Sequence, residues 1–104
     1  MSRLESLRAA AVRRYLQNDR DILEAVHRFG PVSLVGIVDR SGYSMTCVER
    51  RIGRLFRAGT LVRDRHRRTE NGGATPWLYR VEAEAYVKAA AALDVAIREE
   101  EEQW

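Results

Sequence analysis

The segment spanning residues 41–61 constrains the fold of this chain more than any other. Ser41-Gly42 is typical of a tight turn, and Ser44 is a favoured N-cap, because its hydroxyl accepts from an orphan backbone N–H of the first turn. A helix is predicted over residues 45–58. Gly59 should end it, since glycine takes the left-handed conformation without steric cost. The apolar residues of this helix recur at helical spacing and predict a buried face made of Val48, Ile52, Leu55 and Phe56.

The other faces of this helix carry hydroxyl, thioether, carboxylate and guanidinium groups. Such groups suit contacts with base edges and phosphates. They belong to Ser44, Met45, Thr46, Glu49, Arg50, Arg51, Arg54 and Arg57. A core helix with a solvated arginine face has the same pattern, so the flanking segments have to decide between the two interpretations.

Length and composition exclude several classes of protein. A chain of 104 residues predicts one domain, and no apolar run approaches the roughly 18 residues of a membrane span. The N-terminus lacks the apolar core of a secretory signal, so we expect a cytoplasmic protein. One cysteine and two histidines support neither a disulfide nor a metal site, and no cofactor is expected. We see no nucleophile–base pairing and no phosphate-binding glycine loop, and therefore predict that the chain is not an enzyme.

The charge is unevenly distributed along the chain. Residues 1–81 hold 16 Arg and 8 acidic residues, a net charge of +8, whereas residues 82–104 have a net charge of −5. A basic body with an acidic tail suggests a polyanionic partner. A GC-rich genome also favours arginine, which weakens the inference. Cys47, on the central helix, is interpreted as a small packing residue in preference to a redox sensor.

The first 40 residues predict three helices. Leu4, Leu7, Ala11 and Tyr15 follow helical spacing over the first 17 residues, which suggests a helix for packing or dimerisation. Asn18-Asp19 predicts a break and a new start. The next helix, over residues 19–28, should bury Ile22, Leu23, Val26 and Phe29 and end at Gly30-Pro31. Val32 is a candidate for a short strand. Ser33 should cap a short helix over residues 34–40 that buries Leu34, Ile37 and Val38.

A β-hairpin is predicted after the central helix. Residues 60–65 and 76–81 have strand character, and Asn71-Gly72-Gly73 between them is a turn signal. The basic residues of its arms and tip are Arg63, Arg65, Arg67, Arg68 and Arg80.

This order of elements resembles the winged helix-turn-helix regulators of prokaryotes, in particular the small MarR-, ArsR- and PadR-type proteins and their phage and plasmid relatives. The resemblance covers residues 19–82. It rests on Gly30-Pro31-Val32-Ser33, on Ser41-Gly42-Tyr43-Ser44, on residues 48–55 and on Ala58-Gly59-Thr60-Leu61-Val62. The chain departs from the usual pattern at Gly53, which could mark the approach of another backbone, and at Thr60, where an aliphatic residue is common. The expected fold is mainly α with a β-hairpin wing, extended by N- and C-terminal helices.

The resemblance implies double-stranded DNA as the partner, with the recognition helix (44–58) in the major groove and the wing (63–80) on the minor groove or backbone. Ser44, Met45, Thr46, Glu49 and Arg50 are the expected base-edge contacts. Other expected contacts come from Arg51, Arg54, Arg57, Arg65, Arg67, Arg68, Thr69 and Asn71, with possible help from His66. We expect a transcriptional regulator, and a repressor because no activation surface is evident.

The last segment predicts a helix over residues 83–100. Tyr86, Ala90, Leu93 and Ile97 form a heptad-like seam, which we assign to a homodimer; the alternative is that the helix folds back on its own domain. Glu99 to Glu102 should fray, since negative charge opposes the helix dipole there, and Trp104 is expected to be disordered. The predicted divisions are therefore residues 1–18, 19–82 and 83–104.

Two other functions stay open at this point. One is an assembly module in plasmid or phage replication or partition, or a protein–protein interaction domain. The other is a repressor that senses a small-molecule effector, for which the sequence offers no support.

Overall fold

One long helix joins the two helices that were predicted at the N-terminus. The computed structural model describes residues 2–65 and 76–102. In it α1 runs unbroken over Arg3–Phe29, so the predicted break at Asn18-Asp19 is wrong. Asp19 is buried and is paired with Arg51 of the helix α3 (Met45–Arg57). This tertiary contact outweighs the local preference of Asp for a helix start. The predicted end of the helix at Gly30 is confirmed.

The caps that were predicted for the next two helices are confirmed. α2 spans Leu34–Ser41, and its N-cap Ser33 accepts from the Gly36 N–H at 3.1 Å. α3 spans Met45–Arg57, and its N-cap Ser44 accepts from the Cys47 N–H at 3.2 Å. Between them Gly42 takes the left-handed conformation that turns the chain from one helix to the next.

The predicted hairpin strands are present and antiparallel. β1 (Val62–Arg65) pairs with β2 (Trp77–Arg80), with Val62 opposite Arg80 and Arg65 opposite Trp77. Val32 adds a single bridge to Tyr79, which confirms its expected strand character. We call these two strands the wing. The predicted turn at Asn71-Gly72-Gly73 lies outside the described residues.

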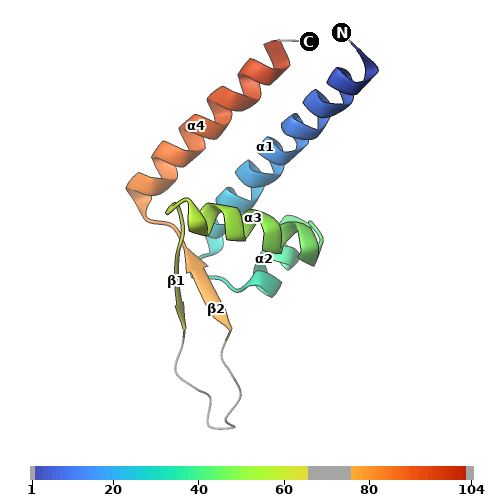
Figure 1. Cartoon of the computed structure of the whole chain (residues 1–104). Helices are drawn as coiled ribbons and strands as arrows, with labels where there is room; N and C mark the ends of the chain where they lie inside the picture. The colour runs from blue at the N-terminus through green and yellow to red at the C-terminus, as the bar shows by residue number, and fades with distance from the viewer. Residues whose placement is uncertain (1, 66–75, 103–104) are drawn as a thin grey trace.

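The last helix, α4, spans Ala83–Glu102 and packs along α1 (Figure 1). Tyr86, Ala90 and Leu93 belong to or pack on the core of the same chain, so their seam serves an intramolecular contact. The helix also continues through Glu102, against the predicted fraying. Trp104 lies outside the described residues. None of the described helices is both long and apolar enough to cross a membrane.

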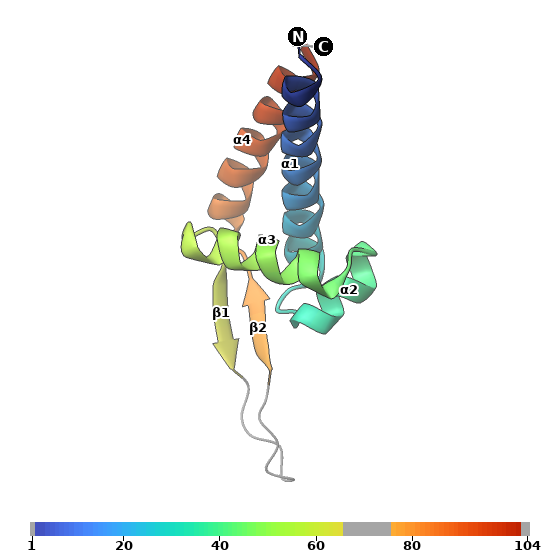
Figure 2. The same ribbon diagram turned by 45° about the vertical axis from the view of Figure 1, so that its right-hand side comes forward.

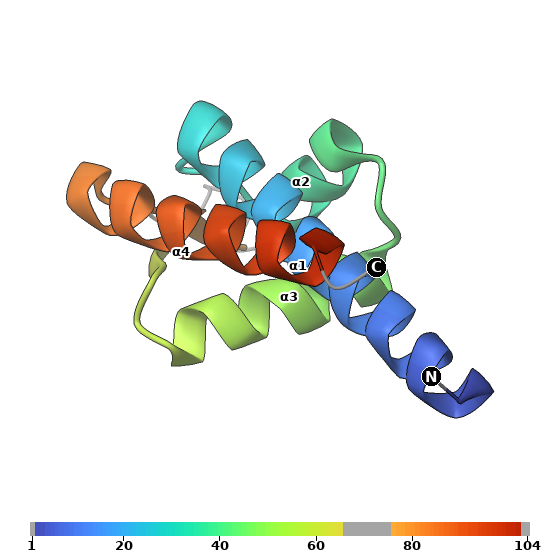
Figure 3. The ribbon, with the colours of Figure 1, turned by 90° about the horizontal axis from the view of Figure 1, so that it is seen from above.

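The core lies where α1, α2, α3 and β2 meet. Its fully buried side chains come from three helices: Ile22, Leu23, Val26, Ile37, Val48 and Ile52. α1 and α4 extend from this core to the end where both termini lie, and the wing extends to the opposite end (Figure 2). α2 and α3 pack against each other as well as against α1, and the view from above shows α1 and α4 crossing (Figure 3).

Replacement of a glycine by alanine should have opposite effects on stability at two places, Gly53 inside α3 and Gly59 just after it. Gly53 lies inside the helix, and the atoms of this chain nearest to a Cβ placed there belong to the flexible tip of Arg57, at 3.1 Å. No backbone of the chain itself therefore makes the close approach that the sequence suggested. We expect Gly53→Ala to raise the free energy of unfolding by up to about 1 kcal/mol, through helix propensity. Gly59 has a φ of +82°, so Gly59→Ala should lower it by about 1–2 kcal/mol.

Urea denaturation followed by far-UV circular dichroism measures both changes. A destabilised Gly53→Ala variant would mean that the Arg57 guanidinium cannot move aside, and a neutral Gly59→Ala variant would remove the left-handed cap as a stabilising feature.

Candidate nucleic-acid interface

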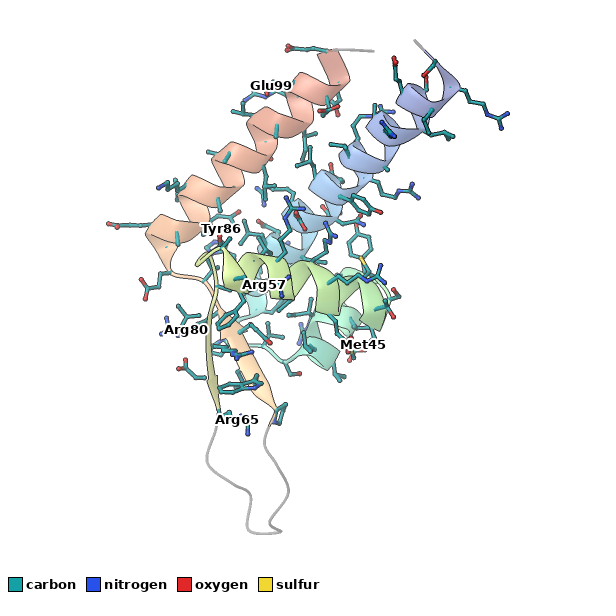
Figure 4. The ribbon with its side chains drawn as sticks, viewed as in Figure 1. Met45, Arg57, Arg65, Arg80, Tyr86 and Glu99 are labelled. Carbon is teal, nitrogen blue, oxygen red and sulfur yellow. The ribbon has the colours of Figure 1, made fainter. Side chains whose placement is uncertain are left out.

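The first half of α3 presents a continuous exposed row of polar and sulfur-containing side chains. Val48, Ile52 and Leu55 anchor the opposite face of the helix in the core, with Phe56 half-buried beside them. The exposed row consists of Ser44, Met45, Thr46, Glu49 and Arg50, all predicted as base-edge contacts. The structure thus brings these predicted residues together at one end of one helix, where Met45 is labelled in Figure 4.

Arg51 lies elsewhere than predicted. Its side chain is only 14% exposed, and its Nη1 lies 3.6 Å from the Asp19 Oδ1 on α1. Its guanidinium also stacks on the Tyr15 ring, 4.7 Å from the centroid. Arg51 therefore fastens α3 to α1 and does not share the exposed row. Arg54 and Arg57 are exposed in the last turns of the helix.

The arginines of the wing divide into packed and exposed groups. Arg63 is half-buried between two rings, 4.2 Å from the Phe56 centroid and 4.4 Å from that of Trp77. Arg80 is paired with Asp64 at 3.1 Å and with Glu82 at 3.5 Å. Arg65 stacks on Trp77 at 4.2 Å but stays exposed at the far end of β1 (Figure 4). The predicted contacts His66, Arg67, Arg68, Thr69 and Asn71 lie outside the described residues.

A groove between α2, α3 and the wing was missed by the sequence analysis. We call it the wing groove. It has a volume of about 460 Å³ and is lined by Ser33, Leu34, Val35, Met45, Glu49, Pro76 and Trp77. Val35 is 60% exposed although it is aliphatic. The signal in the sequence was this valine, which the spacing of Leu34, Ile37 and Val38 places off the buried face of its helix.

Polar contacts fix the orientation of α3 and its turn on α1. The Tyr43 hydroxyl donates to Asp21 at 2.5 Å. Burial and this hydrogen bond raise the pKa of Tyr43 to about 12, so the hydroxyl stays protonated as a donor at neutral pH. The Asn18 amide donates to the Cys47 Sγ at 3.7 Å. Cys47 packs against the core, as interpreted from the sequence.

A second polar cluster holds α4 against α1. Arg20 contacts Asp94 at 3.0 Å and Glu24 at 3.1 Å, and the Tyr86 hydroxyl donates to Glu24. The Tyr86 ring stacks on His27 with 3.7 Å between centroids. Burial lowers the pKa of Arg20, but its acceptors outweigh this and leave the pKa raised. Within residues 2–65 and 76–102, no three His, Cys, Asp or Glu side chains gather into a possible metal site.

Comparison with known proteins identifies the fold. No family model matches the chain, and no curated protein matches it. Among solved structures, the chain is similar to the crystal structure of a MarR family transcription regulator, with a TM-score of 0.57 and 22% identity. The match covers 89% of this chain and 64% of the other, so the chain spans less than two thirds of that protein. The fold is thus the winged helix-turn-helix expected from the sequence, mainly helical with a two-stranded wing.

The buried Asp19 should give the stability of the protein a distinctive pH dependence. Burial raises the pKa of its carboxyl above the ordinary 3.8, and the Arg51 and Arg54 charges oppose this only in part. The folded state therefore binds this proton more tightly than the unfolded state does. Stability from this group is complete below about pH 3.8 and is lost as the pH rises through the raised pKa. We expect wild type to lose stability relative to Asp19→Asn over that window.

Chemical denaturation at a series of pH values measures this difference. Glu24→Gln is the control, because its stability difference from wild type should change with pH in the opposite direction. The Tyr86 hydroxyl and Arg20 lower the pKa of Glu24, so wild type should gain stability relative to that variant as the pH rises toward 4.5. A wild-type minus Asp19→Asn difference that stays flat or rises with pH would contradict the assignment.

Proposed function

We propose that this chain binds double-stranded DNA as a transcription regulator, with α3 in the major groove and the wing on the neighbouring minor groove or backbone. The observation that carries the proposal is the exposed row on the first half of α3, set on a winged-helix fold. In helix-turn-helix proteins the N-terminal residues of the recognition helix contact base edges. The similar solved structure is named a transcription regulator, which supports the same class of function.

The side chains of the interface suggest a division of roles. Arg50 has the geometry to read guanine bidentately, and Glu49 can accept from the amino group of cytosine. Arg54, Arg57 and Arg65 are exposed cations suited to phosphates. From the sequence alone, we keep Arg67, Arg68, Thr69 and Asn71 as proposed contacts of the wing. Arg51 is left out because it pairs with Asp19.

Salt dependence tests the proposal most directly. We expect the affinity for a labelled duplex of arbitrary sequence to fall steeply between three salt concentrations, through release of counterions. Arg65→Ala should make the slope of log K against log salt shallower by about one. The matched control is Arg8→Ala, an exposed arginine of α1 at the end opposite to the wing; its slope should equal that of wild type.

The outcomes separate the candidate functions. Absence of binding even at low salt would favour a protein-interaction or assembly module over a DNA-binding regulator. Equal changes in slope for Arg65→Ala and Arg8→Ala would show that the attraction is diffuse and does not come from the wing.

We further propose that the regulator is a homodimer and a repressor. The N-terminal half of α1 exposes Leu4 (57%) and Leu7 (59%), with Val12 and Tyr15 exposed further along the helix. The outer face of α4 exposes Val87 and Val95. These exposed apolar side chains suit a twofold contact between copies. They replace Tyr86, Ala90 and Leu93, which pack within the chain. Ile97, which is half-buried on α4, remains available to the contact between copies.

Sedimentation velocity tests the dimer. We expect the double variant Leu4→Glu/Leu7→Glu to sediment as a monomer at concentrations where wild type is dimeric, because charge would be buried in the contact. Val35→Glu changes an equally exposed aliphatic residue, one that lines the wing groove on α2, and should leave the dimer intact. A wild-type chain that is monomeric at all concentrations would end this proposal.

A further inference from the structure

The wing groove has a mostly apolar lining and lies beside the exposed polar side chains of α3. Leu34, Val35, Met45 and Trp77 supply its apolar lining. Val35 is 60% exposed and Met45 37% exposed, so both side chains present hydrocarbon or thioether atoms to solvent. Neither side chain belongs to the core cluster or packs against it, and the proposed function assigns Met45 only a general place at the base edges.

The surroundings of the groove are those of a site for a polyanion. α2 and α3 both begin at it, and the N-terminus of a helix has a partial positive charge. The exposed guanidinium group of Arg65 stacks on Trp77, which forms the wall on the wing side. A nucleic acid is the partner whose charge complements this rim and which also carries apolar groups on its base edges.

The residues that line the groove determine whether a phosphate or a base edge of a nucleic acid can fit inside it. A phosphate would lose its hydration against hydrocarbon and would meet the carboxylate of Glu49, so it does not fit inside the groove. A base edge does fit, because a methyl group can contact the apolar side chains while a neighbouring amino group donates to Glu49. In the major groove of DNA, thymine is the base that offers a methyl group.

We propose that Val35 and Met45 together receive the C5-methyl group of a thymine in the major groove, and so determine sequence preference at that position. This inference rests on the proposed function and deepens it. It adds Val35, from the first turn of α2, to a recognition surface otherwise taken from α3. Burial of one methyl group corresponds to a change of about fourfold in affinity.

Removal of that methyl group alone tests the proposal. Preferred sites are selected from a random duplex library, and each thymine is then replaced singly by deoxyuridine, which keeps the base pair and the O4 acceptor. We expect one thymine per half-site at which the replacement weakens wild-type binding about three- to fivefold. The same replacement should have no effect on Val35→Ala and Met45→Ala. Phe29→Ala removes an exposed apolar side chain that lies outside both the wing groove and the proposed dimer contact, and should keep the full effect.

The possible failures are distinguishable. Selected sites whose thymines can all be replaced without loss would overturn this inference and leave the DNA-binding function intact. An effect of deoxyuridine that persists in both Val35→Ala and Met45→Ala would overturn it as well, because the methyl group would then be read elsewhere. Failure to select any duplex would overturn the proposed function and this inference with it.

Another occupant would give a different result. If deoxyuridine is neutral and Val35→Ala instead weakens binding of the hydrophobic dye ANS, the groove takes an apolar small molecule and the thymine assignment is wrong.

Discussion

The burial of one segment of α1 is the constraint on which the rest of the structure depends. Ile22, Leu23 and Val26 are completely or almost completely buried. α2, α3, β2 and α4 all pack against this helix, and α4 does so most extensively. α2 also packs directly on α3 and on β2, so α1 is the common support of a set of elements that contact one another. The ion pair of Asp19 with Arg51 and the hydrogen bond from Tyr43 to Asp21 set how α3 and its preceding turn lie on that helix. The orientation of the exposed row on α3 is therefore set by contacts between α3, its preceding turn and α1.

Capping residues and turn glycines predicted most of the helix ends and turns, because such features are determined by a few neighbouring residues. The caps at Ser33 and Ser44 and the left-handed Gly59 depend on hydrogen bonds and backbone conformations within a few residues. The continuity of α1 could not be predicted in this way. Asn and Asp are common helix starts in isolation, but Asp19 finds its partner on α3, more than 30 residues further along the chain. The partner of the seam on α4 was ambiguous for a similar reason, since a heptad-like spacing is the same whether the facing helix belongs to the same chain or to another.

The sequence predicted those residues of the candidate site whose exposure follows from helical spacing alone. The spacing of Val48, Ile52 and Leu55 placed Met45, Glu49 and Arg50 on other faces, and all three are exposed. Spacing could not separate Arg51 from them, because its position depends on an acidic residue and an aromatic ring of α1. It also could not reveal the wing groove, whose lining comes from segments around residues 33–35, 45–49 and 76–77. Surfaces shared by distant segments require the tertiary structure.

The distribution of arginines changes how the net charge of the chain should be interpreted. Arg20, Arg51 and Arg80 are paired with carboxylates of the same chain, and Arg63 is packed between two rings. These cations already have partners, so the charge of residues 1–81 overstates what a phosphate backbone would meet. On the proposed function, the exposed Arg54, Arg57 and Arg65 would supply attraction that is independent of sequence, whereas the apolar lining of the wing groove cannot attract a polyanion. Sequence preference would come instead from the wing groove and from Glu49 and Arg50, so substitution of a phosphate-contacting arginine should weaken binding to all sequences alike.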